Sequence, residues 1–171
     1  NIYGYSKLIN EHMSEYYSKK LEVPFIGIRF FTVYGTWGRP DMFILKVLSS
    51  QYKKKLFYLN NNGNHLRDFT SVNDVVKILN KLMNKNIKSN KIFNVCSNKP
   101  ILIKDVFQKI QNKVGKIKYK NINRNTADVL NTHGNNKKIL KEIKNNKFSS
   151  FNLELERIID WYKKIKHKKY F

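Results

Sequence analysis

Short apolar segments alternate with amphipathic segments along this chain, and this order restricts the possible folds more than any other feature. Four apolar segments have the length and composition of β-strands, at 25–31, 56–59, 91–95 and 117–122. Six segments have the apolar spacing or the end signals of helices, at 5–20, 41–53, 73–85, 103–114, 135–143 and 152–166. Strands that alternate with helices predict an α/β fold.

Residues at the expected helix ends support this assignment. Pro40 and Asp41 form a sound helix start. Ser71 or Asn73 caps the third helix, and Gly115 ends the fourth. The first helix begins almost at Asn1, although a domain rarely starts on a helix that has an apolar face and no cap. We therefore expect that the upstream half of the protein is missing from this chain.

The charge of the chain admits two interpretations. Among 171 residues, 34 are Lys or Arg and 12 are Asp or Glu, which gives a formal net charge of +22. Such a charge is typical of proteins that bind nucleic acid or an anionic surface. However, five of the 34 are Arg and the other 29 are Lys, and Asn is also abundant. Because Arg suits bidentate phosphate contacts better, we favour a composition set by AT-rich codons, and we expect no nucleic-acid partner.

The remaining composition excludes other classes of protein. Hydrophobic residues make up 41% of the chain, which is enough for a core, and no apolar run approaches the ~20 residues of a membrane span. We therefore expect no membrane partner. The single cysteine, Cys96, cannot form an internal disulfide or a zinc site alone. A reducing compartment, the cytoplasm, is the expected location.

Three segments carry chemistry. In the first, Tyr3 and Lys7 lie one helical turn apart, and an ammonium beside a phenol stabilises the phenolate. Such a tyrosine can exchange a proton with a substrate hydroxyl. A Tyr-x-x-x-Lys pair also arises by chance in a chain with ten Tyr and 29 Lys, so the pair alone is weak evidence.

The second segment, 29–42, is an apolar strand that enters a loop with two Gly, two Arg and a Trp, and ligands bind at such strand ends in open α/β sheets. Arg39 in this loop pairs with a carboxylate or phosphate, or else covers the ring of Trp37. The third segment, 67–74, places Arg67 before a helix start. Capping explains its hydroxyl and carboxylate groups, and the alternative to a functional Arg67 is an ion pair with Asp68 or Asp74.

In this order and spacing, the three segments resemble the second half of an extended short-chain dehydrogenase/reductase. Within that superfamily they are most similar to the UDP-glucuronate 4-epimerases of the NAD-dependent epimerase/dehydratase family. Residues 29–42 are close to the subgroup's Arg-Phe-Phe-Thr-Val-Tyr-Gly-Pro-Trp-Gly-Arg-Pro-Asp-Met, which is much more specific than the Tyr/Lys pair. Weaker matches continue to the end of the chain at Phe93-Asn94-Val95, Asp128-Val129 and Trp161-Tyr162.

The resemblance implies a role for each matching residue and NAD as the cofactor. Tyr3 would be the general base and acid at the 4-hydroxyl of the sugar. Lys7 would hold the nicotinamide ribose and stabilise the Tyr3 phenolate, and Phe31 would lie beside the nicotinamide. The reaction would be a reversible oxidation at C4 of the sugar.

The resemblance also implies the residues that bind the UDP-sugar substrate. Thr32 stands where many related epimerases carry Asn, and would contact the sugar. Arg39 would lie near the sugar and diphosphate, and Arg67 would clamp the diphosphate. Asp128 would contact the uridine ribose. Several residues depart from the family pattern and leave the exact sugar open: Thr36 replaces Pro, Asn73 replaces Asp, and Cys96 and Ala127 replace Gly.

The resemblance implies the C-terminal part of a Rossmann-type doubly wound sheet plus a small α/β substrate-binding domain. Residues 1–31 would end the NAD-binding domain, and residues 32–171 would mainly form the substrate domain, interleaved with late Rossmann elements. The glycines form no dinucleotide-binding fingerprint, so we expect the chain to be inactive alone.

The function that we expect is a nucleotide-sugar 4-epimerase that converts UDP-glucuronate to UDP-galacturonate, as a homodimer when full length. A nucleotide-sugar dehydratase or decarboxylase on the same scaffold is the first alternative. A basic module that binds nucleic acid or an anionic surface is the second. His65 and His133 show no catalytic or metal-binding spacing, and we expect both at the surface.

Overall fold

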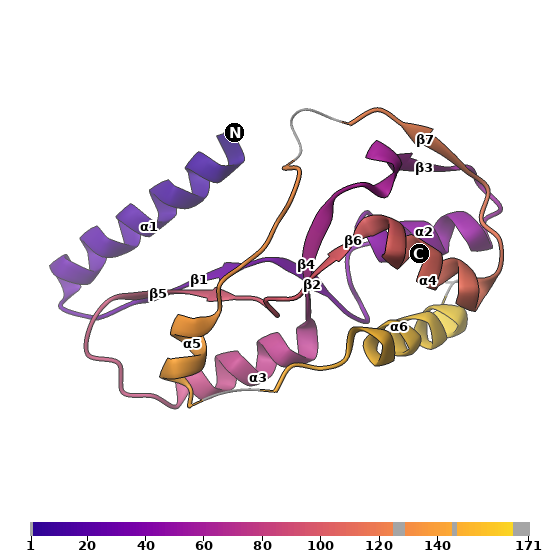
Figure 1. Cartoon of the computed structure of the whole chain (residues 1–171). Helices are drawn as coiled ribbons and strands as arrows, with labels where there is room; N and C mark the ends of the chain where they lie inside the picture. Colours follow the sequence, from indigo (N-terminus) through magenta and orange to yellow (C-terminus); the bar gives the residue numbers. More distant parts are fainter. Residues whose placement is uncertain (1, 125–128, 145–146, 166–171) are drawn as a thin grey trace.

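The computed structural model describes residues 2–124, 129–144 and 147–165. Its elements follow the predicted alternation, so the α/β class is confirmed (Figure 1). Parallel pairs join β1 (Ile26–Phe30) to β5 (Lys91–Val95), and β3 (Phe57–Asn60) to β7 (Tyr119–Ile122). A further sheet has the order β2 (Thr32–Tyr34), β4 (Leu66–Ser71) and β6 (Pro100–Leu102), and β6 runs antiparallel to β4.

Two hydrophobic clusters form the core. One lies around β1 and β5 with α3 (Val72–Met83) and α5 (Lys137–Glu142), and Ile78, Phe93 and Ile139 lie at its centre. The other gathers α2 (Phe43–Tyr52), α4 (Ile103–Val114) and α6 (Phe151–Ile165) against β3 and β4. The chain crosses between the two clusters through β2 and β4, since Val33 packs against the first cluster and Tyr34 and Phe69 belong to the second.

A buried carboxylate joins the clusters. Glu154 of α6 accepts hydrogen bonds from Ser71 Oγ and Asn73 Nδ2, both at 3.1 Å, and pairs with Arg157. Because Ser71 and Asn73 stand at the start of α3, this network fastens the C-terminal helix to the helix of the other cluster. The Ser71 hydroxyl also accepts from the Asn73 amide at 3.2 Å, so Ser71, rather than Asn73, is the cap of α3.

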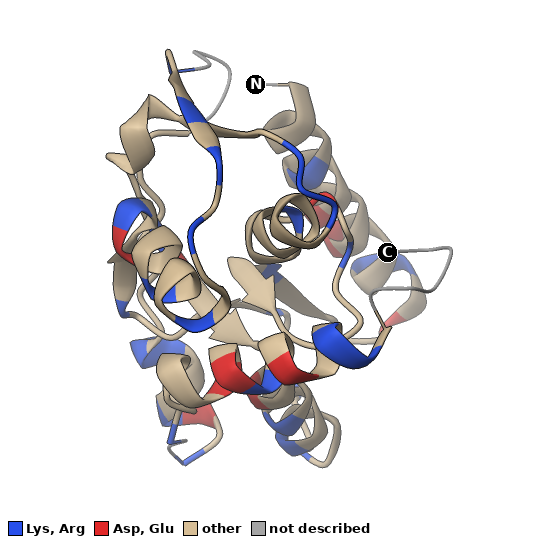
Figure 2. Cartoon of the chain, turned by 90° about the vertical axis from the view of Figure 1, so that its right-hand side faces the viewer, with Lys and Arg blue, Asp and Glu red and all other residues tan. Residues whose placement is uncertain are grey.

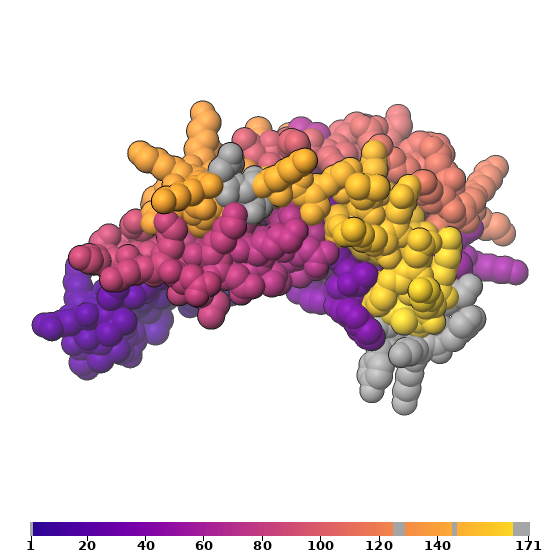
Figure 3. Space-filling view, turned by 90° about the horizontal axis from the view of Figure 1, so that it is seen from below, coloured from indigo at the N-terminus to yellow at the C-terminus, as the bar shows by residue number. Residues whose placement is uncertain are grey.

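Helix α1 (Ile2–Leu21) differs from the other long helices because none of its residues is buried. It stands apart from the rest of the molecule in Figure 1 and lies at the opposite end from α6 in Figure 3. A bidentate ion pair holds it to β1, in which Glu11 accepts from Nε and Nη2 of Arg29, both at 2.7 Å.

The sequence-based prediction missed three strands, β2, β4 and β6, and misplaced several helix starts, among them that of α2. Strand β4 has the polar residues Asp68, Thr70 and Ser71 in buried positions, so it lacks the alternation of a half-buried strand. Strand β6 has only three residues and opens with a proline, which hides it further. Helix α2 begins at Phe43 rather than at residue 41, and its N-cap is Met42, whose side chain makes no capping hydrogen bond, while the Asp41 carboxylate pairs with Arg39.

Candidate functional site

Two adjoining cavities lie beside β2, where the chain passes from one cluster to the other. The first encloses about 230 Å³ and is lined by Phe31, Thr32 and Arg39, together with apolar residues of α2. The second encloses about 260 Å³ and is lined by Thr32 and Arg67, together with residues of β3. The cavities share Thr32, Met42, Phe43 and Phe69. The fold therefore gathers four of the predicted site residues, which the sequence separates by up to 36 positions, around one cleft.

Backbone carbonyls orient Arg67 in this cleft. Its Nη1 donates to the carbonyl oxygens of Leu66 and Leu130, both at 2.9 Å, and the side chain is half-buried. The two aspartates that the sequence offered as partners are engaged elsewhere: Asp68 with residues 97, 98 and 134, and Asp74 with Ser149 at 2.8 and 2.9 Å.

Arg39 lies in the exposed loop between β2 and α2. It makes a bidentate pair with Asp41, from Nε at 3.1 Å and from Nη2 at 2.8 Å. The hydrogen bonds and charge of Asp41 raise the pKa of Arg39, and a weaker effect comes from the Tyr3 phenol. The pair is fully exposed, so a stronger anionic partner can replace Asp41 at low cost.

Tyr3 and Lys7 stand at the N-terminal end of α1, and the Lys7 ammonium lies 5.2 Å from the centre of the Tyr3 ring. Both line an open groove of about 740 Å³ between α1 and β1, with Gly27 and Phe30 on the β1 side. Neither lines the cavities beside β2. The structure therefore places this pair in a different cavity from Thr32 and Arg67.

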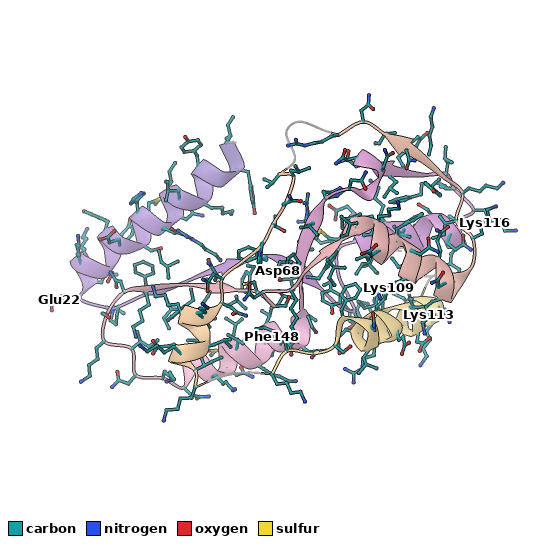
Figure 4. The ribbon with its side chains drawn as sticks, in the orientation of Figure 1. Glu22, Asp68, Lys109, Lys113, Lys116 and Phe148 are labelled. Carbon is teal, nitrogen blue, oxygen red and sulfur yellow. The ribbon has the colours of Figure 1, made fainter. Side chains whose placement is uncertain are left out.

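Asp68 is a site residue that the sequence suggested only as a partner for Arg67. Its side chain is fully buried at the centre of the molecule (Figure 4). It accepts hydrogen bonds from Ser97 Oγ at 2.7 Å and from the backbone N–H groups of Asn98 and Gly134 at 3.1 Å each. It thus ties β4 to two distant segments. The available signal in the sequence was a charged residue directly before Phe69. The partners of Asp68, however, follow β5 and β7 and lie far away in sequence.

The segment after residue 128 runs along β4 and is hydrogen-bonded to it. The Leu66 N–H donates to Asn131 Oδ1 at 2.8 Å, and the Thr132 N–H donates to the Leu66 carbonyl at 3.1 Å. These bonds place Leu130 where its carbonyl meets Arg67. Asp128 lies outside the described residues, so its predicted contact with a uridine ribose stays a prediction.

The two histidines differ in their surroundings. His133 is exposed, as expected, with Nε2 2.7 Å from Asn98 Oδ1. The prediction is wrong for His65, which is half-buried and lines the same cavity as Arg67, because residues 61–64 turn the chain back over β4. Among residues 2–124, 129–144 and 147–165, no group of three or more His, Cys, Asp and Glu side chains could hold a metal ion.

Burial distinguishes Tyr34 in the cleft from Tyr3 in the groove. Burial raises the pKa of Tyr34, and the negative charges of Glu154 and Asp74 raise it further. Tyr34 is therefore neutral at any physiological pH and cannot serve as a proton acceptor. Tyr3, by contrast, is 71% exposed and stands beside an ammonium group, so it is the tyrosine suited to exchange a proton.

The model of the NAD dependent epimerase/dehydratase family matches residues 1–96, which include Tyr3, Lys7, Arg39 and Arg67. The chain belongs to this family. The match therefore covers the segments 29–42 and 67–74 as well as Tyr3 and Lys7 of α1.

Individual proteins of the family extend the similarity to the end of the chain. Protein CapI of Staphylococcus aureus is 31% identical over 95% of this chain and 54% of its own length. UDP-glucuronate 4-epimerase 4 of Arabidopsis thaliana is 26% identical over 95% of this chain and 41% of its own length. The chain therefore spans about half the length of the curated relatives that it matches.

Solved structures show the same fold. The crystal structure of UDP-glucuronic acid 4-epimerase from Bacillus cereus, in complex with UDP-glucuronic acid and NAD, superposes with a TM-score of 0.88. The two chains are 23% identical, and the match covers 95% of this chain and 52% of the other. The Rossmann-type architecture expected from the sequence is confirmed, whereas the boundary between domains at residues 31 and 32 stays a prediction.

The basic residues do not concentrate at the cleft. Figure 2 shows Lys and Arg on several helices and strands that face different directions. Lys109, Lys113 and Lys116, for example, lie on or just after α4 (Figure 4). In the part of the chain that the structure describes, no helix combines the length and the hydrophobicity that a membrane span requires.

Proposed function

We propose that this chain is the latter half of an NAD-dependent nucleotide-sugar 4-epimerase that interconverts UDP-glucuronate and UDP-galacturonate. The observation that carries the proposal is the pair of adjoining cavities, in which Thr32, Arg39 and Arg67 surround one cleft. A cleft with a threonine hydroxyl and two guanidinium groups suits a ligand that carries a sugar carboxylate and a diphosphate. The sequence similarity to plant UDP-glucuronate 4-epimerase supports this choice of substrate.

Each of these residues has a role in the proposal. Arg67, oriented by two carbonyls, binds the diphosphate. Thr32, which belongs to both cavities, contacts the sugar between the two guanidinium groups. Arg39 exchanges the exposed Asp41 carboxylate for an anionic group of the ligand. Asp128 contacts the uridine ribose, as the resemblance implies.

Tyr3 removes the proton from the sugar 4-hydroxyl and later returns it, and Lys7 stabilises the phenolate and binds the nicotinamide ribose. The open groove that these residues line leaves the phenol and the ammonium accessible, which fits a nucleotide cofactor. Phe31 lines the first cavity and directly follows Phe30, which lines the groove. This position suits a contact with the nicotinamide. When bound, NAD supplies the hydride acceptor and donor at C4.

Because Tyr3 and Lys7 do not line the substrate cavities, the chain alone does not assemble the reaction centre that we propose. We therefore expect no turnover and only weak NAD binding by the purified chain. Measurable epimerase activity, or NAD binding below micromolar concentration in equilibrium dialysis, would overturn this part of the proposal.

Substrate binding is tested by calorimetry with UDP and UDP-glucuronate. The chain should bind both, and Arg67→Ala should weaken both by about tenfold or more, because a charged hydrogen-bonding group is lost. Lys116→Ala is the matched control, since it removes one positive charge at an exposed position outside both cavities. Equal binding by the wild type and Arg67→Ala would refute the assignment of the cleft.

Two alternatives give different results in the same assays. A nucleotide-sugar dehydratase or decarboxylase would bind UDP-sugars in the same cleft, and nuclear magnetic resonance of the products made by the longer protein distinguishes these reactions. A nucleic-acid-binding module would bind duplex DNA tightly, with an affinity that falls steeply with salt. The dispersed Lys and Arg residues argue against a dedicated surface of that kind.

We also propose that the full-length protein is a homodimer and that α1 contributes to the contact. Every residue of α1 is unburied, and its large apolar side chains include Leu8, Ile9, Met13 and Tyr16, which are 43% to 61% exposed. Sedimentation of the full-length protein with Met13→Glu should show a monomer if this contact forms.

A further inference from the structure

The loop between β2 and α2 contains a strained residue next to the proposed anion-binding arginine. Trp37 has φ of 60° and is 67% exposed. A bulky residue rarely adopts the left-handed region, and strain of this kind gathers at functional sites. The neighbouring Gly35 leaves no room for a side chain, because a Cβ there would overlap Val72 of α3. The base of the loop is therefore fixed, while Trp37 and Arg39 project from its outer part.

An aromatic contact holds the strained residue. The ring of Trp37 meets the ring of Trp161 on α6 edge to face, with 5.4 Å between centroids and 64° between planes. Trp161 in turn contacts Tyr162, whose buried ring stacks on Tyr52 at 5.5 Å. A row of four aromatic rings thus connects the outer part of the loop to the core of the larger cluster.

The position of the loop determines the opening of the first cavity. Gly35, Gly38 and Arg39 line that cavity on the loop side, and Ile158 lines it from α6, one turn before Trp161. Arg39 is two residues from Trp37, so a change in the strained backbone conformation of Trp37 moves Arg39 with it. Arg39 has an exposed partner in Asp41 of the same loop, and that pair does not hold the loop to the body of the protein.

We propose that the Trp37–Trp161 contact is a latch that positions Arg39 over the sugar end of the cleft. Trp37 is then a positioning residue, which acts through Arg39 and discriminates a sugar nucleotide with a carboxylate from the nucleotide alone. The ring contact compensates the strained backbone, and its loss lets the loop relax away from the cavity. The role of Arg39 in this inference rests on the proposed function.

Spectroscopy tests the latch without any ligand, because Trp37 and Trp161 are the only two tryptophans of the chain. Indole rings this close couple their electronic transitions, so the circular dichroism spectrum should contain a couplet. Trp37→Phe and Trp161→Phe should each abolish the whole couplet. If instead the signals lost in the two single variants sum to the wild-type tryptophan signal, with no couplet, the rings are not in contact in solution. That result would refute the latch.

Calorimetry tests the positioning role. Trp37→Ala should lower the affinity for UDP-glucuronate about tenfold, because the charged contact of Arg39 with this ligand is lost. The same substitution should change the affinity for UDP by less than about twofold. Trp37→Phe keeps a ring and should restore most of the affinity. Trp161→Leu should reproduce Trp37→Ala, and the double variant should be no weaker than either. Because Trp37 is exposed, Trp37→Ala should fold even if Trp161→Leu does not.

The results separate this inference from the function on which it rests. If the wild type binds neither UDP nor UDP-glucuronate, the proposed function fails, and the role of Arg39 fails with it, whatever the spectra show. If the wild type binds both and Trp37→Ala weakens them equally, or neither, the proposed function stands and the positioning role of Trp37 is refuted.

Discussion

Replacement of Asp68 should reveal how strongly one buried carboxylate organises the cleft. Asp68→Ala removes the acceptor of three hydrogen bonds, from Ser97 Oγ and from the backbone N–H groups of Asn98 and Gly134. The Gly134 N–H is buried and would lose its partner entirely, whereas water can reach the exposed Asn98 and the half-buried Ser97. An unsatisfied buried donor costs about 1–3 kcal/mol, so with the lost bonds of the other two donors we expect about 3–4 kcal/mol of destabilisation.

Asp68→Asn should be much milder. Its amide oxygen can accept from both backbone N–H groups, as Oδ2 of Asp68 does. Its amide nitrogen would then face Ser97 Oγ, and a serine hydroxyl oxygen can accept a hydrogen bond. The loss of the charge on the acceptor should cost about 1–2 kcal/mol.

Urea denaturation followed by circular dichroism gives the free energies of unfolding. Amide hydrogen exchange at Gly134 should also accelerate in Asp68→Ala, because its N–H is freed. Asp160→Ala is the control, since it removes an exposed carboxylate on α6 and should change stability by less than about 0.5 kcal/mol. The reasoning is wrong if Asp68→Ala unfolds at the urea concentration of the wild type, or if Asp68→Asn is equally destabilised.

Three further predictions concern charge and titration. Burial of the thiol, and to a smaller extent the Asp68 carboxylate, raise the pKa of Cys96 to about 11. A thiol reagent at pH 8 should therefore react with Cys96 only as fast as the chain unfolds. Rapid colour development in native buffer would contradict this prediction. The hydrogen bonds from Arg29 hold the pKa of Glu11 below its ordinary value of 4.5. The Glu11–Arg29 contact therefore stabilises the fold fully above pH 4.5, and this stabilisation is lost as the pH falls through the lowered pKa of Glu11. The protection factors of the α1 amides, which correct for the pH dependence of intrinsic exchange, should therefore fall on acidification, and Glu11→Gln should remove this pH dependence if the ion pair is its cause. Arg67→Lys should recover only part of the UDP affinity lost in Arg67→Ala, because an ammonium cannot replace the forked guanidinium; full recovery in calorimetry would show that charge alone suffices.

The sequence predicted some elements well because local rules apply to them. The helix that became α3 has an apolar face around Ile78 and a serine cap, both readable from neighbouring residues. The helix that became α4 ends at Gly115, whose φ of 89° few other residues adopt. By contrast, β4 was not predicted, because the reason that Asp68 can be buried there lies 29 and 66 residues away, in Ser97 and Gly134.

The same distinction applies to the site. The types and spacing of Tyr3, Lys7, Arg39 and Arg67 were sufficient to indicate the family, because each motif is local and has a chemistry of its own. Which of them share a cavity was not readable, since this depends on how β2 and β4 pair and on where α1 packs. The latch at Trp37 was equally hidden, because its partner is on the last helix.

By itself, the sequence determined the alternating α/β pattern, most helix ends and the motif chemistry, all of which arise from interactions within a few residues. Only the tertiary structure decided that Thr32 and Arg67 line one cleft while Tyr3 and Lys7 line an open groove. The physical reason is that burial, strand pairing and hydrogen bonds between distant segments depend on the whole packed chain.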